Sequence, residues 1–338
     1  MSLFSREVHE NHNPRVYLTL VRRHFKVFFK NKISVVFALL VPMITLIIYI
    51  VFLRQLQVDA IDANLGSVIL GHNVTEGLKM RAHLLADGWM LSGIIAVSCI
   101  SVSLNTCTIM LADRLTGVSK DFVSSPISRR SINASYLIFN ILASFLINFC
   151  VLLVAYIYLG AVGGFHVSVG DTFLLIPILL LSVLSASLIT CFIASFMTSF
   201  NTYNSVSVII SSGSGFLIGA FMPVSMLPDV AKNVPLFFPG TYSAGLLRTF
   251  CLRGYYQNLS SYLQNVEHYK PEEIAEITRA LNSKLSMDIN FFGHIVTPGY
   301  MVLAIFVFAI FFIILNMLFL DRNLRGKLHG KIKIRKKK

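Results

Sequence analysis

The chain has 338 residues, of which 55% are hydrophobic and 13% are charged, and its mean hydropathy is +0.71. Soluble domains carry about 25% charged residues, so this composition excludes a soluble enzyme and indicates an integral membrane protein. The formal net charge of +13 requires no nucleic acid partner, because basic segments beside membrane spans ordinarily bind anionic membrane lipid.

Six apolar segments are long enough to cross a bilayer as helices, which takes about 20 predominantly apolar residues each. We therefore expect an all-α, polytopic membrane protein, with a cytoplasmic segment 1–32, a six-span domain 33–320 and a basic tail 321–338. The expected transmembrane helices are residues 33–53, 90–112, 132–160, 172–199, 203–224 and 296–320.

The distribution of Lys and Arg predicts the orientation of these spans. Of the 29 Lys and Arg residues, 20 lie in residues 1–32, in the loop 113–130 and in the tail from residue 321. Because basic loops stay in the cytoplasm, we expect both chain termini and the 113–130 loop on that side of the cell membrane. Segments 54–89 and 225–295 are then external.

The stretch VRRHFKVFFK, residues 21–30, predicts a basic amphipathic helix on the inner membrane surface. Its two faces consist of Val21, Phe25, Phe28 and Phe29 against Arg22, Arg23, Lys26 and Lys30. Ligand types alone do not make a metal site in a terminal segment, so we expect none upstream of this helix. The residues concerned are Glu7, His9, Glu10 and His12.

The loop DRLTGVSKDFVSSPISRR, residues 113–130, predicts a second surface helix. Its apolar residues Leu115, Val118 and Phe122 recur at helical spacing. Pro126 then ends the helix. A short amphipathic helix that presents charge to the cytoplasm fits this pattern, and a solvated turn is the alternative.

Small residues recur every four positions on one face of the fourth and fifth expected spans, where they would let two helices approach closely. These residues are Ser187, Cys191, Ser195 and Ser199 in the fourth span, and Ser207, Ser211, Gly215 and Gly219 in the fifth. Such packing fits both a contact within one chain and a contact between the two chains of a dimer.

The fifth span is followed by an apolar stretch that prolines interrupt and that ends at Leu247-Arg248. Proline breaks helices, and irregular backbone at membrane depth needs protein cover. This stretch is therefore either an external loop or an element folded back into the membrane. The prolines are Pro223, Pro228, Pro235 and Pro239.

The external segment also contains a predicted helix. Pro271 followed by two glutamates is typical of a helix start. An apolar stripe along this helix predicts that it packs on a neighbouring element. The stripe consists of Ile274, Ile277, Leu281 and Leu285.

The composition of the spans limits the ways in which a transporter could be driven. Their interiors contain no Asp, Glu, Lys or Arg, which disfavours an ion-coupled carrier. The sequence also lacks a phosphate-binding loop, since Gly326-Lys327 is followed by Leu328. An ATP-driven pump would therefore need its ATPase in another chain. A passive channel or ion-coupled carrier is the alternative, and a membrane-embedded enzyme is disfavoured because no His, Asp or Glu within the spans pairs with a nucleophile.

In its order of spans and motifs the chain resembles the permeases of type-two ABC exporters. The family pattern in the second loop is an acidic residue, a glycine four positions on, a proline, a hydroxyl residue and a basic residue. The matching residues are Asp113, Gly117, Pro126, Ser128 and Arg129, and the prolines before Leu247-Arg248 fit as well. Asp113 is a mild departure, because the family more often has Glu there.

The resemblance implies that the 113–130 helix couples the spans to a separate nucleotide-binding ATPase subunit, which would bind the ATP and Mg. No cofactor is expected in this chain. It also implies a re-entrant pair of short helices over residues 222–248, which includes Arg248. The coupling residues would be Asp113, Arg114, Gly117, Lys120, Phe122, Pro126 and Arg129.

The resemblance further implies a two-fold transporter with a second permease copy or a homologue, in which the fifth span lines the path with the second. The chain would then export an amphipathic substrate. A drug or peptide is favoured over a lipid or lipid-linked glycan, because the external segments are larger than is usual for glycan exporters.

Overall fold

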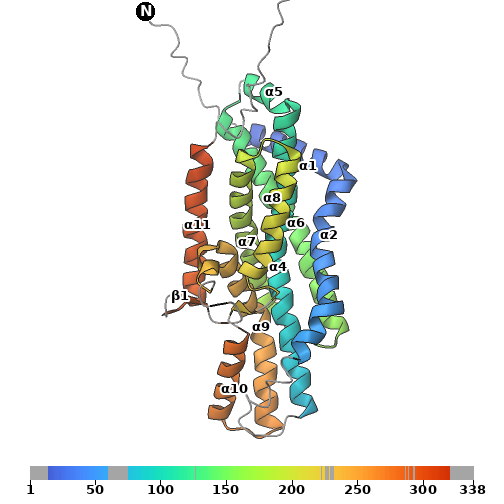
Figure 1. Cartoon of the computed structure of the whole chain (residues 1–338), viewed down its shortest axis with the longest axis vertical. Helices are drawn as coiled ribbons and strands as arrows, with labels where there is room; N and C mark the ends of the chain where they lie inside the picture. Colours follow the sequence, from blue (N-terminus) through green and yellow to red (C-terminus); the bar gives the residue numbers. More distant parts are fainter. Residues whose placement is uncertain are drawn as a thin grey trace, which may run out of the picture.

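The computed structural model describes residues 14–59 and 75–319, except residues 126, 222, 225–227, 229–231, 286, 288, 292 and 293. Figure 1 shows an elongated bundle of helices that run roughly along its long axis. The helix α5 lies at one end of this bundle and α10 at the other, and we name the two ends after them. The basic tail 321–338 and the four N-terminal residues with ligand-type side chains lie outside the described residues.

The chain is all-α, and the described residues add one two-stranded ladder to its helices. The elements are α1 (Pro14–Lys30), α2 (Lys32–Ile48), the π-helix η1 (Tyr49–Leu53), α4 (Glu76–Thr116), α5 (Val118–Ser124), α6 (Arg129–Ala161), α7 (Val169–Phe196), α8 (Phe200–Leu217), the 3-10 helix η3 (Val234–Phe237), α9 (Pro239–Asn265), α10 (Pro271–Lys284), β1 (Asn290–Phe291), β2 (His294–Ile295) and α11 (Pro298–Leu318). Both predicted surface helices are present as α1 and α5.

Five helical segments of the described chain are long and apolar enough to cross a membrane, and they coincide with five of the six expected spans. They are Lys32–Asp59, Glu76–Thr116, Arg129–Ala161, Val169–Phe196 and Pro298–Leu318. The helix α8 occupies the place of the expected fifth span, but it has 18 residues and a high share of Ser, Asn and Gly. A multi-pass membrane protein follows from these helices, and the count of six crossings stays a prediction.

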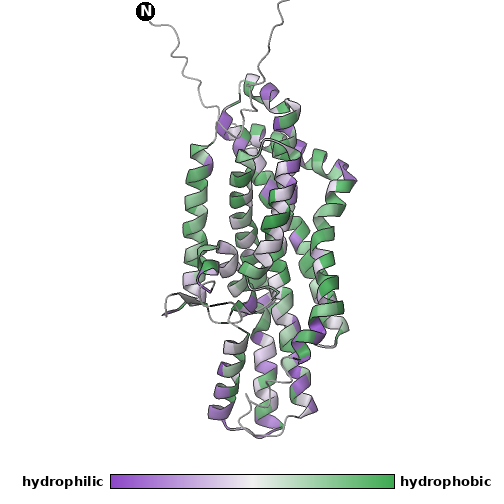
Figure 2. Cartoon of the chain, in the orientation of Figure 1, coloured by the Kyte–Doolittle hydropathy of each residue, from purple (hydrophilic) through white to green (hydrophobic). Residues whose placement is uncertain are grey.

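The helix α4 is the central element of the bundle. It packs against α2, α6, α7, α8 and α9, and most of its 41 residues are buried. Its first residue lies 14 positions before the expected start of the second span, because the side chain of Thr75 caps the backbone N–H of Leu78. At a rise of about 1.5 Å per residue, α4 is about 60 Å long, twice the thickness of a hydrocarbon core. Figure 2 shows that α2 and α11, at the outside of the bundle, consist mostly of hydrophobic residues, as lipid-facing helices require.

The start of α4, the end of α9 and all of α10 project beyond the bundle as a three-helix extension (Figure 1). The predicted helix at Pro271 is confirmed as α10, and its apolar stripe is buried. Glu273 caps this helix by accepting the backbone N–H of Lys270. The extension has its own core, which consists of Leu78, Ala82, Leu259, Leu263, Tyr269, Ile274, Ile277 and Leu281.

The segment after α8 differs from the expected pair of short helices over residues 222–248. The short 3-10 helix η3 is followed by α9, which has 27 residues and continues past Arg248 to Asn265. Pro235 and Pro239 lie in the first turns of these two helices, where the missing N–H does no harm. No proline follows until Pro271, so nothing in the sequence ends α9 at Arg248. The re-entrant position of this segment in the membrane stays a prediction.

Candidate functional site

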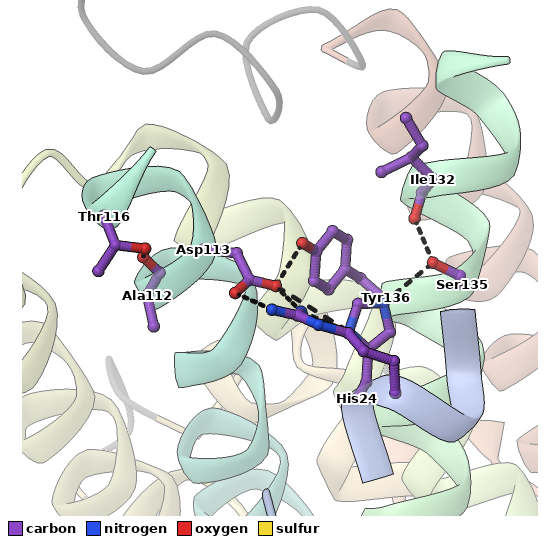
Figure 3. A network of polar contacts seen from close by, with 8 residues as sticks. His24, Ala112, Asp113, Thr116, Ile132, Ser135 and Tyr136 are labelled. Atoms are coloured by element: carbon purple, nitrogen blue, oxygen red, sulfur yellow. Dashed lines mark hydrogen bonds and ion pairs between the residues drawn. The ribbon is translucent and has the colours of Figure 1, made fainter. Parts of the chain in front are cut away.

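A buried carboxylate at the α5 end of α4 joins three helices. Asp113 accepts two hydrogen bonds from the guanidinium of Arg23 on α1, one of them at 2.9 Å between Nη2 and Oδ1. The Tyr136 hydroxyl on α6 donates to Oδ2 of the same carboxylate at 2.7 Å. Figure 3 shows Tyr136 beside Asp113, with the hydrogen bond between them as a dashed line. We call the group of Arg23, His24, Asp113, Ser135 and Tyr136 the Asp113 clamp.

His24 completes the Asp113 clamp without adding a charge to it. Its Nε2 lies 3.1 Å from the hydroxyl of Ser135, and its ring stacks on Tyr136 with 4.2 Å between the ring centroids. Burial, assisted by the neighbouring charge of Arg23, lowers the pKa of His24 to about 4. The hydrogen bond with Asp113 raises the pKa of Arg23. One permanent cation and a neutral imidazole therefore surround the carboxylate at neutral pH.

The next residue, Arg114, attaches α4 to α7. Its guanidinium donates to the backbone carbonyls of Ala194 at 2.8 Å and Ser195 at 3.0 Å, and also to that of Met197. These carbonyls lie at the C-terminus of α7, where helices leave acceptors unsatisfied and where a cation is favourable. Two adjacent residues thus hold the α5 end of α4 against α1, α6 and α7.

The structure corrects the expectation that Asp113 and Arg114 lie on a surface that contacts a partner. Both side chains are buried, because α4 continues to Thr116 and carries them into the bundle. The surface helix begins only after Gly117, whose φ of 91° lies in the left-handed region that ends helices.

Most of the remaining predicted coupling residues lie at the surface. Lys120 and Arg129 are exposed. Phe122 is half-buried, and its ring centroid lies 5.2 Å from Cζ of Arg23. This contact joins α5 to the Asp113 clamp. Pro126 lies outside the described residues.

A groove of about 840 Å³ opens between α2, α4 and α8 on the side of the bundle towards α5. Its wall on α2 is apolar, with Ile33, Phe37 and Val41. Its walls on α4 and α8 alternate apolar with uncharged polar side chains, and among its described lining residues none is Asp, Glu, Lys or Arg. The volume suits a drug-sized ligand. The polar lining consists of Asn31, Ser34, Ser101, Asn105, Thr108, Tyr203, Asn204, Ser207, Ser211 and Ser212.

The four small residues expected on one face of the fifth span have three different surroundings in the structure. Ser207 and Ser211 line the groove. Gly215 packs under the ring of Phe221 from the same segment, and a Cβ there would clash with that ring. Gly219 lies beyond the end of α8 with a φ of 70°, so it forms a turn. The prediction of helix packing along this whole face is therefore wrong for Gly219, because α8 ends at Leu217.

Three of the four small residues expected in the fourth span, Ser187, Cys191 and Ser195, lie on α7 and are buried inside the chain, whereas Ser199 lies beyond α7 and caps α8. The hydroxyl of Ser187 donates to the Asn140 amide oxygen on α6 at 2.8 Å. One turn later, the sulfur atoms of Cys191 and Cys107 on α4 are 3.7 Å apart. Small polar side chains therefore hold α4, α6 and α7 together where lipid offers no hydrophobic drive.

A second ionic clamp joins α4 to the first span and was not predicted. Asp87 is fully buried and accepts hydrogen bonds from the Tyr49 hydroxyl at 2.6 Å and from Nε of Arg54 at 2.9 Å. The tyrosine begins the π-helix η1, and such segments occur often at functional sites. The charge distribution predicts that Arg54 and Asp87 lie in an external loop, but both lie in helical segments that are long and apolar enough to span a membrane. The available signal was the helical spacing of the apolar residues Leu78, Ala82, Leu85 and Trp89.

Comparison with known proteins agrees with this architecture. The model of the ABC-2 type transporter family matches residues 15–250, which is more than two thirds of the chain. The matched region extends from α1 through both clamps and the groove into α9. No curated protein is matched. The chain belongs to the ABC-2 type transporter family.

Proposed function

We propose that the chain is the permease subunit of an ATP-driven exporter and that α5 docks on a separate ATPase subunit. This subunit would bind ATP and Mg, and both termini of the permease would face the cytoplasm of the cell. The observation that carries the proposal is the Asp113 clamp directly behind α5. It gives a short surface helix a firm attachment to several helices at once.

A docking helix must transmit displacement, and the contacts behind α5 are suited to this. Charge-assisted hydrogen bonds to a carboxylate are roughly twice as strong as neutral ones. Arg23 makes two of them while its guanidinium also lies over Phe122 of α5. A push on α5 would therefore move α1 and α4 together, and Arg114 would carry the movement to α7.

The groove between α2, α4 and α8 is the proposed substrate site. Its apolar wall and uncharged polar walls favour an amphipathic molecule, and we favour a drug or peptide over a lipid or lipid-linked glycan. The exposed side of α8 carries Val208, Ile209 and Phe216, which suit contact with a second permease copy or a homologue. Two grooves would then face each other across a two-fold axis.

The proposal is tested with purified permease, the candidate ATPase and lipid vesicles. Lys120→Glu reverses an exposed charge on α5, and Gly117→Trp adds bulk beside it. Both variants should insert normally but lose ATPase binding and substrate-stimulated hydrolysis. Lys120→Glu is the decisive variant, because a side chain at position 117 also strains the backbone at a φ of 91°. Arg279→Glu is the control, because Arg279 is exposed at the opposite end on α10. Wild-type export by both α5 variants contradicts the docking role, and export without any ATPase contradicts the pump itself.

A further inference from the structure

Arg248 is a buried cation without a counter-charge. Its side chain lies in the middle of α9, and the residue is 4% exposed. Within the described part of the chain, the guanidinium makes one hydrogen bond, to the carbonyl oxygen of Gly219, and no ion pair. Its Cζ lies 4.5 Å from the ring centroid of Trp89 on α4. Nε of Arg248 and Nε1 of Trp89 are both buried and have no hydrogen-bond partner among the described residues.

The two N–H groups without partners at Arg248 and Trp89 both need a hydrogen-bond acceptor, and the structure offers them none among the described residues. A single neutral donor would suffice to hold the carbonyl of Gly219. An unpaired guanidinium in an apolar surrounding is costly, and ionisable residues inside membrane domains ordinarily mark a path for a charged group. Two unsatisfied N–H groups around one cation fit the oxygens of an anionic group, to which arginine binds through several donors at once.

Arg248 lies where the groove would continue towards the α10 end. The groove is lined as far as Ser101 on α4 and Ser212 on α8. About two helical turns further on, the turn after α8 closes the space between these helices. A Cβ on Gly93 of α4 would lie 2.9 Å from Cα of Ala220, so this turn packs directly on the α4 backbone. The carbonyl that Arg248 holds belongs to the same turn.

We propose that Arg248 binds an anionic oxygen group of the transported amphiphile, such as a phosphate or a carboxylate. In the structure the Gly219 carbonyl accepts a hydrogen bond from the guanidinium, and this bond keeps the turn 218–220 packed on Gly93. The anionic group of the substrate replaces this carbonyl, and the turn moves away from α4. Arg248 thereby selects amphiphiles that carry a negative charge, while the uncharged groove accepts their remaining part. This inference rests on the proposed export function and adds the substrate class.

Trp89 is the single tryptophan of the chain, so its fluorescence reports on this site alone. The test uses the purified permease in maltoside detergent without any ATPase, and titrates dodecyl phosphate. We expect a saturable change in Trp89 emission, and an apparent affinity at least about tenfold weaker in Arg248→Gln, since hydrogen bonds to charged groups carry about 1.5–3 kcal/mol. Arg279→Gln is the control, because it removes the same charge from an exposed position on α10.

The same titration is repeated separately with uncharged dodecanol and with inorganic phosphate. The proposal predicts that neither reproduces the change seen with dodecyl phosphate. An equal response to dodecanol overturns the role of charge, and an equal response to inorganic phosphate overturns the requirement for an amphiphile. Both comparisons use the wild-type protein, so they hold even if Arg248→Gln does not fold. A loss of ATPase coupling in the earlier experiment would leave this fluorescence response unchanged, which separates the two proposals.

Discussion

Arg23 and Asp113 lie 90 residues apart in the sequence and form a bidentate ion pair that joins α1 to the α5 end of α4. The carboxylate is buried and the guanidinium is half-buried under the coupling helix. The pair therefore links the surface at which we propose docking to the centre of the bundle. A substitution of Asp113 is therefore expected to lower the stability of the fold and not only to disturb docking of the ATPase.

Asp113→Asn should destabilise the folded protein. The substitution removes the charge that Arg23 needs and weakens the bond from Tyr136. We expect a loss of roughly 2–4 kcal/mol, about 1 kcal/mol less than the roughly 3–5 kcal/mol for fully buried pairs, because Arg23 is partly exposed to solvent. Thermal unfolding in detergent measures it. Asp121→Asn on the exposed face of α5 is the control, and equal unfolding temperatures for the two variants would contradict the clamp.

Gly117→Ala tests the turn between α4 and α5. The φ of 91° strains any residue with a side chain, although no atom within 4 Å would obstruct a Cβ. We expect a destabilisation of about 1–2 kcal/mol from backbone strain alone. Gly160→Ala is the matched control, since Gly160 also has open space around it but lies in helix α6 at an ordinary φ. That change should be neutral or stabilising, and the prediction fails if both variants behave alike.

Gly215→Leu should destabilise the chain itself rather than an assembly. The new side chain collides with the ring of Phe221 in the same segment. Overpacking of this kind costs about 1–3 kcal/mol. Val208→Leu on the exposed face of α8 should stay within about 0.5 kcal/mol. Unfolding of the monomeric permease at high detergent concentration separates the two, and unchanged stability of Gly215→Leu would refute the contact.

The stability of the Asp113 clamp should depend on pH through His24. Its pKa of about 4 in the folded protein is below the ordinary value of 6.5, so the unfolded chain binds more protons between these values. Stability is therefore complete above pH 6.5 and falls as the pH decreases towards 4, by roughly 2–3 kcal/mol. Comparing wild type with His24→Phe at pH 7 and pH 4 isolates this contribution. A pH dependence that is the same in both proteins would contradict it.

The sequence predicted the helices better than the contacts between them. Apolar length alone located α2, α6, α7 and α11 within a few residues, because a bilayer fixes how long a spanning helix must be. The extension of α4 to Glu76 was missed, since its charged and polar residues resemble a loop when their partners are unknown. Only the structure shows that the half-buried Arg54 pairs with the buried Asp87.

The candidate site shows the same limit. The pattern in residues 113–130 predicted a helix correctly, but placed Asp113 at its surface. Helical spacing gives the face of a residue only when the end of the helix is known, and Gly117 ends α4 four residues later than expected. The buried position of His24 could not be predicted either, because it lies among the basic residues Arg22, Arg23 and Lys26 while its partner Ser135 is 111 residues away.

A photo-crosslink from α5 to the ATPase subunit in native membranes tests directly whether α5 docks on that subunit. A photoreactive amino acid replaces Lys120 in one variant and Arg279 of α10 in the other, because both side chains are exposed and lie at opposite ends of the bundle. If α5 docks on the ATPase, a crosslink forms from position 120 and none forms from position 279. A crosslink from position 279, or none from position 120 in membranes that transport, would contradict it.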